Sequence, residues 1–282
     1  MGAPNDLVLD VAELAEALAE PNPPTVLDAR WRLGGPPGRA EYATAHLPGA
    51  VFVDLDVEVC GAPGAGGRHP LPDPEALQVV LRAAGVRAGH PVVAYDAGDG
   101  QAAARVWWTL RWAGHERVRV LDGGYAAWVA AGGRVTRDEP QPEPGDITVQ
   151  PGGMPILDAG GAAELAKTGV LLDARVAPRF RGEVEPVDRV AGHIPGAVNV
   201  PAAEQVGPDG RLTSADALRA RFAEAGVEEG VRVGAYCGSG VTAAQTVLAL
   251  RLAGRPDAEL YVGSWSHWIT DPTRPVAAGD SA

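Results

Sequence analysis

The 282-residue sequence contains only two cysteines, Cys60 and Cys237. Two thiols are too few for a disulfide framework and their spacing fits no zinc site, so we expect free thiols, no metal and a cytoplasmic location. Long hydrophobic runs are also missing, since no window approaches the roughly 18 apolar residues that a membrane span needs. The stretch from Met1 to Glu20 lacks the basic start and the apolar run of a signal peptide. The composition therefore excludes a membrane-spanning protein.

Positive charge is scarce as well. The chain has 24 lysines and arginines against 36 aspartates and glutamates, which gives a formal net charge of −12. An acidic surface repels the phosphates of nucleic acids and of anionic lipids, so neither is expected as a main partner. A small anionic substrate is still allowed, because it responds to the local field inside one pocket.

The sequence contains an internal duplication. Four landmarks return in the same order: LDAR at 27–30 and 172–175, H(L/I)PGAV at 46–51 and 193–198, LR(W/L)AG at 110–114 and 250–254, and an aromatic segment at 123–128 and 263–268. The two copies of each landmark lie 140 to 147 residues apart. A period of this length indicates a duplicated domain rather than a short solenoid repeat.

Each half alternates short apolar strands with helical patterns. In the first half, strands are predicted at 26–28, 51–54, 92–95 and 118–121, and helices at 11–18, 74–84, 102–113 and 125–131. Asp10 and Asp73 suit helix N-caps. Strands that are apolar throughout indicate burial on both faces, hence an α/β fold with mainly parallel sheets between helices. The acidic, proline-rich segment 138–145 marks the join, which predicts domains at 1–138 and 154–282 with a linker at 139–153.

The second half contains a reactive-looking stretch, residues 233–244. A strand ends at Tyr236, a helix begins near Val241, and the loop between them starts with Cys237. Two glycines let successive backbone N–H groups point inward, and the helix N-terminus adds partial positive charge. With no lysine or histidine beside it in the sequence, the Cys237 sulfur is expected to be held as a reachable thiolate by the main chain alone. The alternative is an inert cysteine that ends a core strand.

Two other chemistries can be weighed against this one. A Cys-x5-Arg phosphatase loop needs arginine at position 243, which is alanine. In the first half, Gly98–Ala103 fits G-x-G-x-x-A after a strand, with Asp122 about 20 residues further on, as in a dinucleotide site. The shared landmarks, however, align that loop with the Cys237 loop and place Asp96 opposite Cys237. We therefore read it as a degenerate copy without a nucleophile.

Taken together, the duplicated landmarks, the loop from Cys237 to Ala243 and the segment Gly263–Trp268 resemble tandem-domain sulfurtransferases of the rhodanese family. The resemblance implies two rhodanese-like domains, the first inactive because Asp96 replaces the cysteine, and no cofactor. It also implies that a Cys237 persulfide carries sulfur from a small anionic donor, 3-mercaptopyruvate or thiosulfate, to a thiol or cyanide. A thioredoxin-like reductant is a further expected partner.

The choice of donor stays open at this point. The CGSGVT loop resembles that of the mercaptopyruvate type, whereas thiosulfate enzymes typically carry basic residues just after the cysteine. Thiosulfate as the main donor is one alternative. Another is a non-enzymatic sulfur carrier or regulatory module that hands its persulfide to a protein partner only.

The resemblance also assigns roles to individual residues. Cys237 is the nucleophile and Ser239 orients the donor or relays a proton, while a plain loop serine is the alternative. Backbone N–H groups of the loop hold the developing charge, and Thr242 also braces the helix start. The loop residues assigned to donor binding are Gly238, Gly240, Val241 and Thr242.

Further donor-binding residues are expected outside the loop. Arg179 matches a family arginine that binds the anionic end of the donor, and Arg189 is the one candidate for a second arginine, although it lies closer to His193 than the family pattern has it. Asp56 and His69 resemble an Asp and a His that the first domain contributes. A surface arginine and a surface-loop histidine are the respective alternatives.

Overall fold

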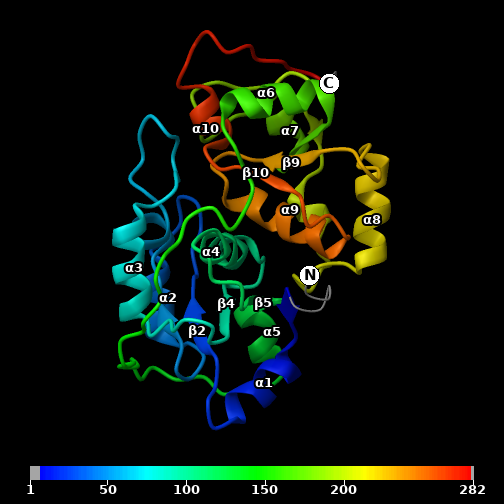
Figure 1. Cartoon of the computed structure of the whole chain (residues 1–282). Helices are drawn as coiled ribbons and strands as arrows, with labels where there is room; N and C mark the ends of the chain where they lie inside the picture. Colours follow the sequence, from blue (N-terminus) through cyan, green and yellow to red (C-terminus); the bar gives the residue numbers. More distant parts are fainter. Residues whose placement is uncertain (1–6, 281–282) are drawn as a thin grey trace. The chain divides into compact units, whose positions relative to one another are not determined.

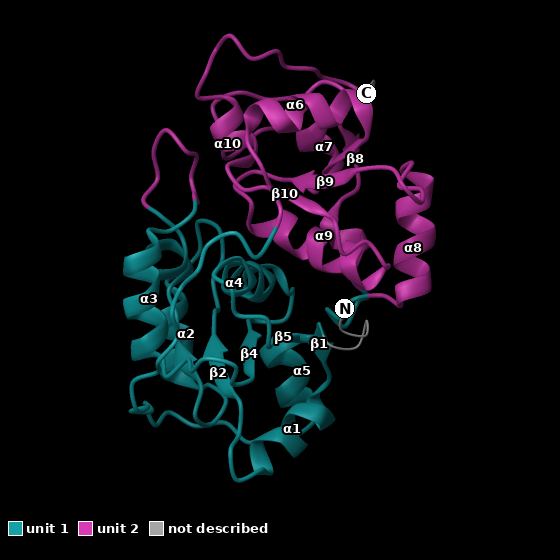
Figure 2. Cartoon of the chain, viewed as in Figure 1, with its two compact units in different colours: residues 1–61, 71–154, 207–212 teal, residues 62–70, 155–206, 213–282 magenta. Residues whose placement is uncertain are grey.

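The computed structural model describes residues 7–280, which form two compact units (Figures 1 and 2). Unit 1 comprises Met1–Gly61, Leu71–Met154 and Gly207–Leu212, and unit 2 comprises Ala62–Pro70, Pro155–Val206 and Thr213–Ala282. Each unit therefore includes a short segment that the duplicated sequence would place in the other half. The segment 62–70, which contains His69, belongs to unit 2.

Each unit is built on a five-stranded sheet in which all neighbouring strands are parallel. The order is β1-β5-β4-β2-β3 in unit 1 and β6-β10-β9-β7-β8 in unit 2. The strands of unit 1 are β1 (Val8–Leu9), β2 (Thr25–Asp28), β3 (Val51–Phe52), β4 (Val92–Tyr95) and β5 (Val118–Leu121). Those of unit 2 are β6 (Ile156–Leu157), β7 (Val170–Asp173), β8 (Val198–Asn199), β9 (Val233–Tyr236) and β10 (Glu259–Tyr261). The predicted α/β fold with parallel sheets is confirmed.

The helices follow the predicted pattern closely. In the first half they are α1 (Val11–Ala19), α2 (Gly38–Thr44), η2 (Leu55–Val59), α3 (Pro74–Ala83), α4 (Gln101–Trp112) and α5 (Gly124–Ala130). In the second half they are α6 (Ala159–Thr168), α7 (Ala177–Phe180), η3 (Ala202–Glu204), α8 (Ala215–Glu224), α9 (Val241–Leu252) and α10 (Ser264–Trp268). None of the helices described between residues 7 and 280 is long and apolar enough to cross a membrane.

Helix starts carry the expected caps. The Asp10 carboxylate accepts from the Glu13 N–H at 2.8 Å in a complete capping box, and Asp73 accepts from the Ala76 N–H at 2.9 Å. The strand predicted at 51–54 ends earlier, at Phe52, because the Asp54 carboxylate instead caps η2. Helices α2 and η2 and strand β1 were not predicted.

In unit 2, helices α6, α7 and α10 lie on one side of the sheet and α9 on the other (Figure 1). The strands β7 and β9 are buried throughout. Apolar side chains from the sheet and from α6, α7 and α10 form one core, which includes Leu165, Phe180, Tyr236, Trp265 and Trp268. Helix α9 packs against β9 and β10, so the loop that joins β9 to α9 has a rigid support on both sides.

The repeated sequence landmarks form equivalent buried contacts in the two units. Asp28 and Arg30 form a buried ion pair at 2.7 Å, and Asp173 and Arg175 form the equivalent pair at 2.6 Å. His46 stacks on Tyr42 and His193 stacks on Phe180, with ring centroids 3.8 and 3.7 Å apart. The two histidines therefore pack as equivalent structural residues of the two units.

The segment 139–153 has no helix or strand and runs along unit 1. Its backbone donates hydrogen bonds to that unit, from Gly145 to the Arg82 carbonyl at 2.7 Å and from Gln150 to the Ala113 carbonyl at 2.9 Å. The segment is therefore tied to the unit 1 surface rather than hanging free.

Candidate active site at Cys237

Cys237 occupies the turn between β9 and α9. Gly240, the residue before α9, has a φ of 81°, a conformation that glycine adopts without strain. This turn lets the Gly240 N–H donate to the Cys237 sulfur, with the nitrogen 3.1 Å from Sγ. The sulfur thus accepts a main-chain hydrogen bond at the N-terminus of a 12-residue helix, where the helix dipole also favours negative charge.

The start of α10 holds the same loop from outside. The Trp265 N–H donates to the Cys237 carbonyl at 3.0 Å and the Cys237 N–H donates to Ser264 Oγ at 3.1 Å. As a result Cys237 is only 2 % exposed. This burial differs from the reachable sulfur that the sequence predicts, and it means that a donor must present a small sulfur-bearing group.

The segment 62–70 brings a histidine to the loop. His69 Nδ1 lies 2.7 Å from Ser239 Oγ, and both residues are buried. The segment is fixed by Gly67, whose φ of 104° and position against Gly263 leave no room for a side chain, since a Cβ would lie 2.7 Å from the Gly263 carbonyl oxygen. The Arg68 N–H also donates to Ser266 Oγ at 3.0 Å. The loop geometry therefore sets the position of His69.

Two guanidinium groups lie against the residue that follows the cysteine. A Cβ atom on Gly238 would be 3.1 Å from Nη2 of Arg68 and 3.7 Å from both Nη atoms of Arg179. The absence of a side chain at Gly238 is what allows this approach. The expectation that backbone groups alone supply positive charge at the loop is therefore wrong, because two arginines contribute as well.

Two carboxylates hold these arginines in place. Glu185 accepts from Nε and Nη2 of Arg179 at 3.1 and 2.7 Å, and Asp188 accepts from both Arg68 and Arg179. Burial acts to raise the pKa of Glu185, but the bond from Arg179 and the N–H groups of Val187 and Asp188 outweigh it and lower that pKa. Glu185 therefore stays ionised and keeps Arg179 aimed at the loop.

Comparison with known protein families identifies the two units. The model of the rhodanese-like domain matches residues 10–131 and 159–271, which together make up most of the chain. The chain belongs to the rhodanese family. Both halves of this rhodanese are matched, so the tandem arrangement predicted from the duplicated landmarks is confirmed.

Full-length relatives of this rhodanese carry sulfurtransferase names. A Mycobacterium tuberculosis protein provisionally named thiosulfate sulfurtransferase SseB is 48% identical over 286 residues, covering 99% of each chain. A Pseudomonas aeruginosa protein provisionally named 3-mercaptopyruvate sulfurtransferase is 49% identical and covers 97% of this chain and 98% of its own. The crystal structure of Escherichia coli SseA, a 3-mercaptopyruvate sulfotransferase, superposes with a TM-score of 0.83 at 34% identity, covering 93% of this chain and 100% of SseA.

The other residues named in the sequence analysis make the following contacts within their own units. Arg189 donates to the Ile269 carbonyl, so its guanidinium is engaged at the end of α10. Asp56 belongs to unit 1, where its carboxylate accepts from Trp31 Nε1 at 2.9 Å in a cavity of about 230 Å³. Val241 and Thr242 form the first turn of α9, as the strand–loop–helix pattern predicts.

Sequence reasoning missed Arg68, Glu185 and Asp188. Arg68 directly precedes His69, and Asp188 directly precedes Arg189. The signal that could have found Glu185 and Asp188 is the concentration of charge in the loop 181–189, whereas Arg68 is the one formally charged residue of the glycine-rich loop 60–70. Within residues 7–280, no group of three or more His, Cys, Asp or Glu side chains is placed to hold a metal ion.

In unit 1 of this rhodanese, Asp96 holds the place of the cysteine. The Tyr125 N–H donates to the Asp96 carbonyl at 2.8 Å, just as Trp265 does to Cys237. The Asp96 carboxylate accepts the N–H groups of Gly98, Gly100 and Ala103 at 2.9 to 3.1 Å. These are the groups that a bound phosphate would need, so the protein's own Asp96 carboxyl group already occupies the G-x-G-x-x-A loop.

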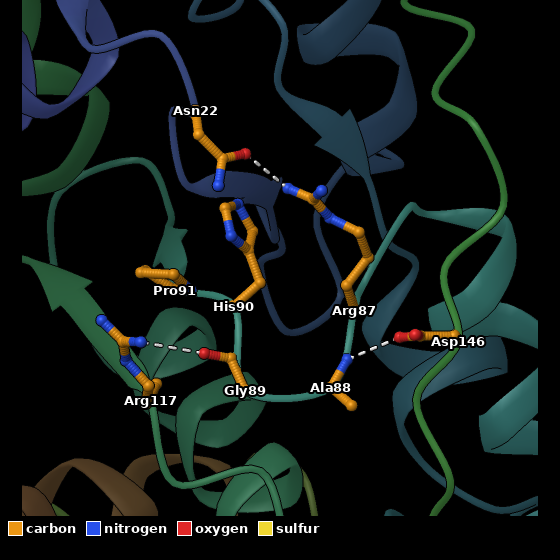
Figure 3. A pocket seen from close by; sticks show the side chains of 8 residues that line it. All are labelled: Asn22, Arg87, Ala88, Gly89, His90, Pro91, Arg117 and Asp146. Atoms are coloured by element: carbon orange, nitrogen blue, oxygen red, sulfur yellow. Dashed lines mark hydrogen bonds between the residues drawn. The ribbon is translucent and has the colours of Figure 1, made fainter.

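Unit 1 also has a cavity of about 530 Å³ at the end of its sheet that is opposite to the Asp96 loop. Figure 3 shows the residues that line it. His90 and Pro91 lead into β4 and Arg117 leads into β5, so this cavity is at the amino ends of the strands. Its arginines are turned to protein acceptors, Arg87 to Asn22 and Arg117 to the Gly89 carbonyl (Figure 3). Ligands of parallel α/β sheets bind at the carboxyl ends, where the Cys237 loop lies.

Proposed function

We propose that this protein is a sulfurtransferase in which Cys237 carries the transferred sulfur as a persulfide. The observation that carries the proposal is the hydrogen bond that the Cys237 sulfur accepts from the Gly240 N–H at the start of α9. The guanidinium groups of Arg68 and Arg179 lie against the next residue of the same loop, Gly238. Such a setting gives the sulfur a main-chain hydrogen-bond donor and would attract an anionic sulfur donor. The same loop in unit 1 has no thiol, so we assign the chemistry to unit 2 alone.

With 3-mercaptopyruvate, the Cys237 thiolate attacks the donor sulfur. A sulfur–sulfur bond forms, the donor carbon–sulfur bond breaks, and its electron pair leaves as the enolate of pyruvate, which then takes up a proton. In this proposal the paired His69 and Ser239 deliver that proton, which their 2.7 Å contact supports. With thiosulfate, the same attack releases sulfite and needs no proton at carbon. The N–H groups of the loop hold the negative charge throughout.

Of the two donors, we propose 3-mercaptopyruvate as the main one. The His69–Ser239 pair is useful for a carbanion leaving group and not for sulfite, and this favours the donor that Pseudomonas and Escherichia relatives are named for. A thiol, a thioredoxin-like protein or cyanide would then remove the outer sulfur. Both cysteines are free, which suits a reducing, cytoplasmic setting.

The test is a steady-state assay with each donor and a thiol acceptor. We expect turnover with 3-mercaptopyruvate at a higher kcat/KM than with thiosulfate, and loss of turnover in Cys237→Ser. The matched control is Cys60→Ala, which removes the other buried thiol and is expected to leave turnover unchanged. Absence of turnover with both donors, although the persulfide forms and passes to a protein acceptor, would instead support the carrier alternative.

A further inference from the structure

The carboxylate of Asp188 joins the two arginines at the Cys237 loop. Its Oδ1 accepts from Arg68 Nη1 at 2.8 Å, and its Oδ2 accepts from Arg179 Nη2 at 3.0 Å. The Asp188 side chain is 4 % exposed, against 22 % for Arg68 and 14 % for Arg179. One buried carboxylate thus bridges two partly exposed guanidinium groups.

This bridge belongs to a cluster in which positive and negative charges are equal in number. Arg175 completes it, since it pairs with Asp173 at 2.6 Å and lies 3.5 Å from Glu185. The members are Arg68, Arg175, Arg179, Asp173, Glu185 and Asp188. Because each cation faces a carboxylate at short range, the cluster offers hydrogen-bond donors to a ligand without a large net positive field.

Of the N–H groups in the cluster that have no acceptor, two face the residue that follows the cysteine. Among residues 7–280, no acceptor takes a hydrogen bond from Nη2 of Arg68 or from Nη1 of Arg179. Both atoms lie against Gly238, the residue after the cysteine. Two guanidinium edges facing one point suit the two oxygens of a single carboxylate.

We propose that Asp188 is a positioning and specificity residue that selects a monoanionic carboxylate donor over a dianion. It bridges Arg68 and Arg179 through its two oxygens and cancels one of their two positive charges. A dianion such as thiosulfate gains less from this partly neutralised pair than it would from two free guanidiniums. This inference rests on the proposed function of Cys237, and it adds Arg68 as a donor-binding residue.

The experiment compares kcat/KM for 3-mercaptopyruvate and thiosulfate in the wild-type protein and in Asp188→Asn. Removing one negative charge should favour the dianion, so the ratio of thiosulfate to mercaptopyruvate kcat/KM should rise by about tenfold, mainly through KM. Asp188→Glu keeps the charge and should keep the wild-type ratio. The matched control is Asp216→Asn, which removes one charge from the exposed start of α8 and should leave the ratio unchanged.

A second variant should lower the ratio of thiosulfate to mercaptopyruvate kcat/KM. Arg68→Gln removes one positive charge while leaving Asp188 in place, so thiosulfate should lose more than mercaptopyruvate does. This variant also serves if Asp188→Asn fails to fold, as judged by circular dichroism, because Arg68 is the most exposed of the three residues in the bridge.

The outcomes separate the two levels of the proposal. A ratio that stays within about twofold of wild type in both variants, or an equal rise in KM for both donors, would overturn the selective role of Asp188. Failure of the wild-type protein to form a Cys237 persulfide with either donor would instead overturn the proposed function itself.

Discussion

The Nδ1 atom of His69 lies 2.7 Å from the hydroxyl oxygen of Ser239, although 170 residues separate them in the chain. If the pair acts as one proton-relay unit, either His69→Ala or Ser239→Ala should lower kcat with 3-mercaptopyruvate by about 100-fold. The double variant should lose little more than a single one, because the residues act together. Steady-state kinetics measure this.

A serine elsewhere in unit 2 provides the control for that pair. The Ser214 hydroxyl caps α8 by accepting a hydrogen bond from the Ala217 N–H. Ser214→Ala removes this cap and should lower the free energy of unfolding by about 1 kcal/mol while leaving kcat unchanged. Losses in His69→Ala and Ser239→Ala that simply add in the double variant would show that the two side chains do not work as a unit.

The conformation of Gly67 in segment 62–70 leads to a second prediction, on the kinetics of a glycine-to-alanine variant. Gly67→Ala forces a side chain into a φ of 104° and against the Gly263 carbonyl, which costs about 1–3 kcal/mol locally and displaces Arg68 and His69. We expect kcat/KM to fall by more than about tenfold. Gly64→Ala, whose Cβ would meet nothing within 4 Å, is the matched control. Equal kinetics for the two variants would contradict the positioning role of this segment.

The two predicted arginines should behave differently. Arg179 faces the Cys237 loop, so Arg179→Gln should raise the donor KM by about 30-fold or more through loss of a charge-assisted hydrogen bond. Arg189 donates to the Ile269 carbonyl, so Arg189→Gln should lower stability while changing KM by less than about twofold. A KM increase in Arg189→Gln as large as that in Arg179→Gln would show that Arg189 binds the donor.

Asp96 predicts a pH dependence of stability. Burial, and after it the charge of Asp99, raises the pKa of Asp96 from its usual 3.8 to about 7, against the lowering effect of its N–H donors. The folded state therefore binds the Asp96 proton more tightly than the unfolded state. The stabilising contribution of that proton is fully present below about pH 3.8 and is lost as the pH rises through 7.

Urea unfolding of the wild-type protein and of Asp96→Asn checks this sign. The free energy of unfolding of the wild type, relative to the variant, should fall by up to about 1.4 kcal/mol per pH unit between pH 4 and 7 and then level off. A difference that stays constant over this range, or that grows with pH, would show that Asp96 is ionised throughout in the folded protein.

Most of the fold could be predicted because its strands are apolar throughout and its helices have clear caps. Strands β4, β5 and β9 were predicted with the bounds that the structure gives. Strand β1 has only two residues and α2 buries only Tyr42, so neither leaves a periodic apolar pattern. Such elements depend on their neighbours for stability, and local sequence does not identify them.

Part of the candidate site could likewise be predicted from the sequence, and part could not. The Cys237 loop could be predicted because its glycines and its strand–helix context are local. The pairing of Arg68 with Asp188 could not, since 120 residues separate two loop positions that share no periodicity. The placement of His69 in the same unit as Ser239 depends on the segment 62–70 crossing from one half of the sequence to the other unit.

The most direct test of the account is mass mapping of the protein after a single exposure to 3-mercaptopyruvate in the absence of acceptor. We predict that the peptide containing Cys237 gains about 32 Da, one sulfur atom, while the peptide containing Cys60 is unchanged. Addition of a thiol should remove that mass. An unmodified Cys237 peptide, or sulfur found on Cys60 instead, would contradict the proposal that the second unit's thiolate carries the sulfur.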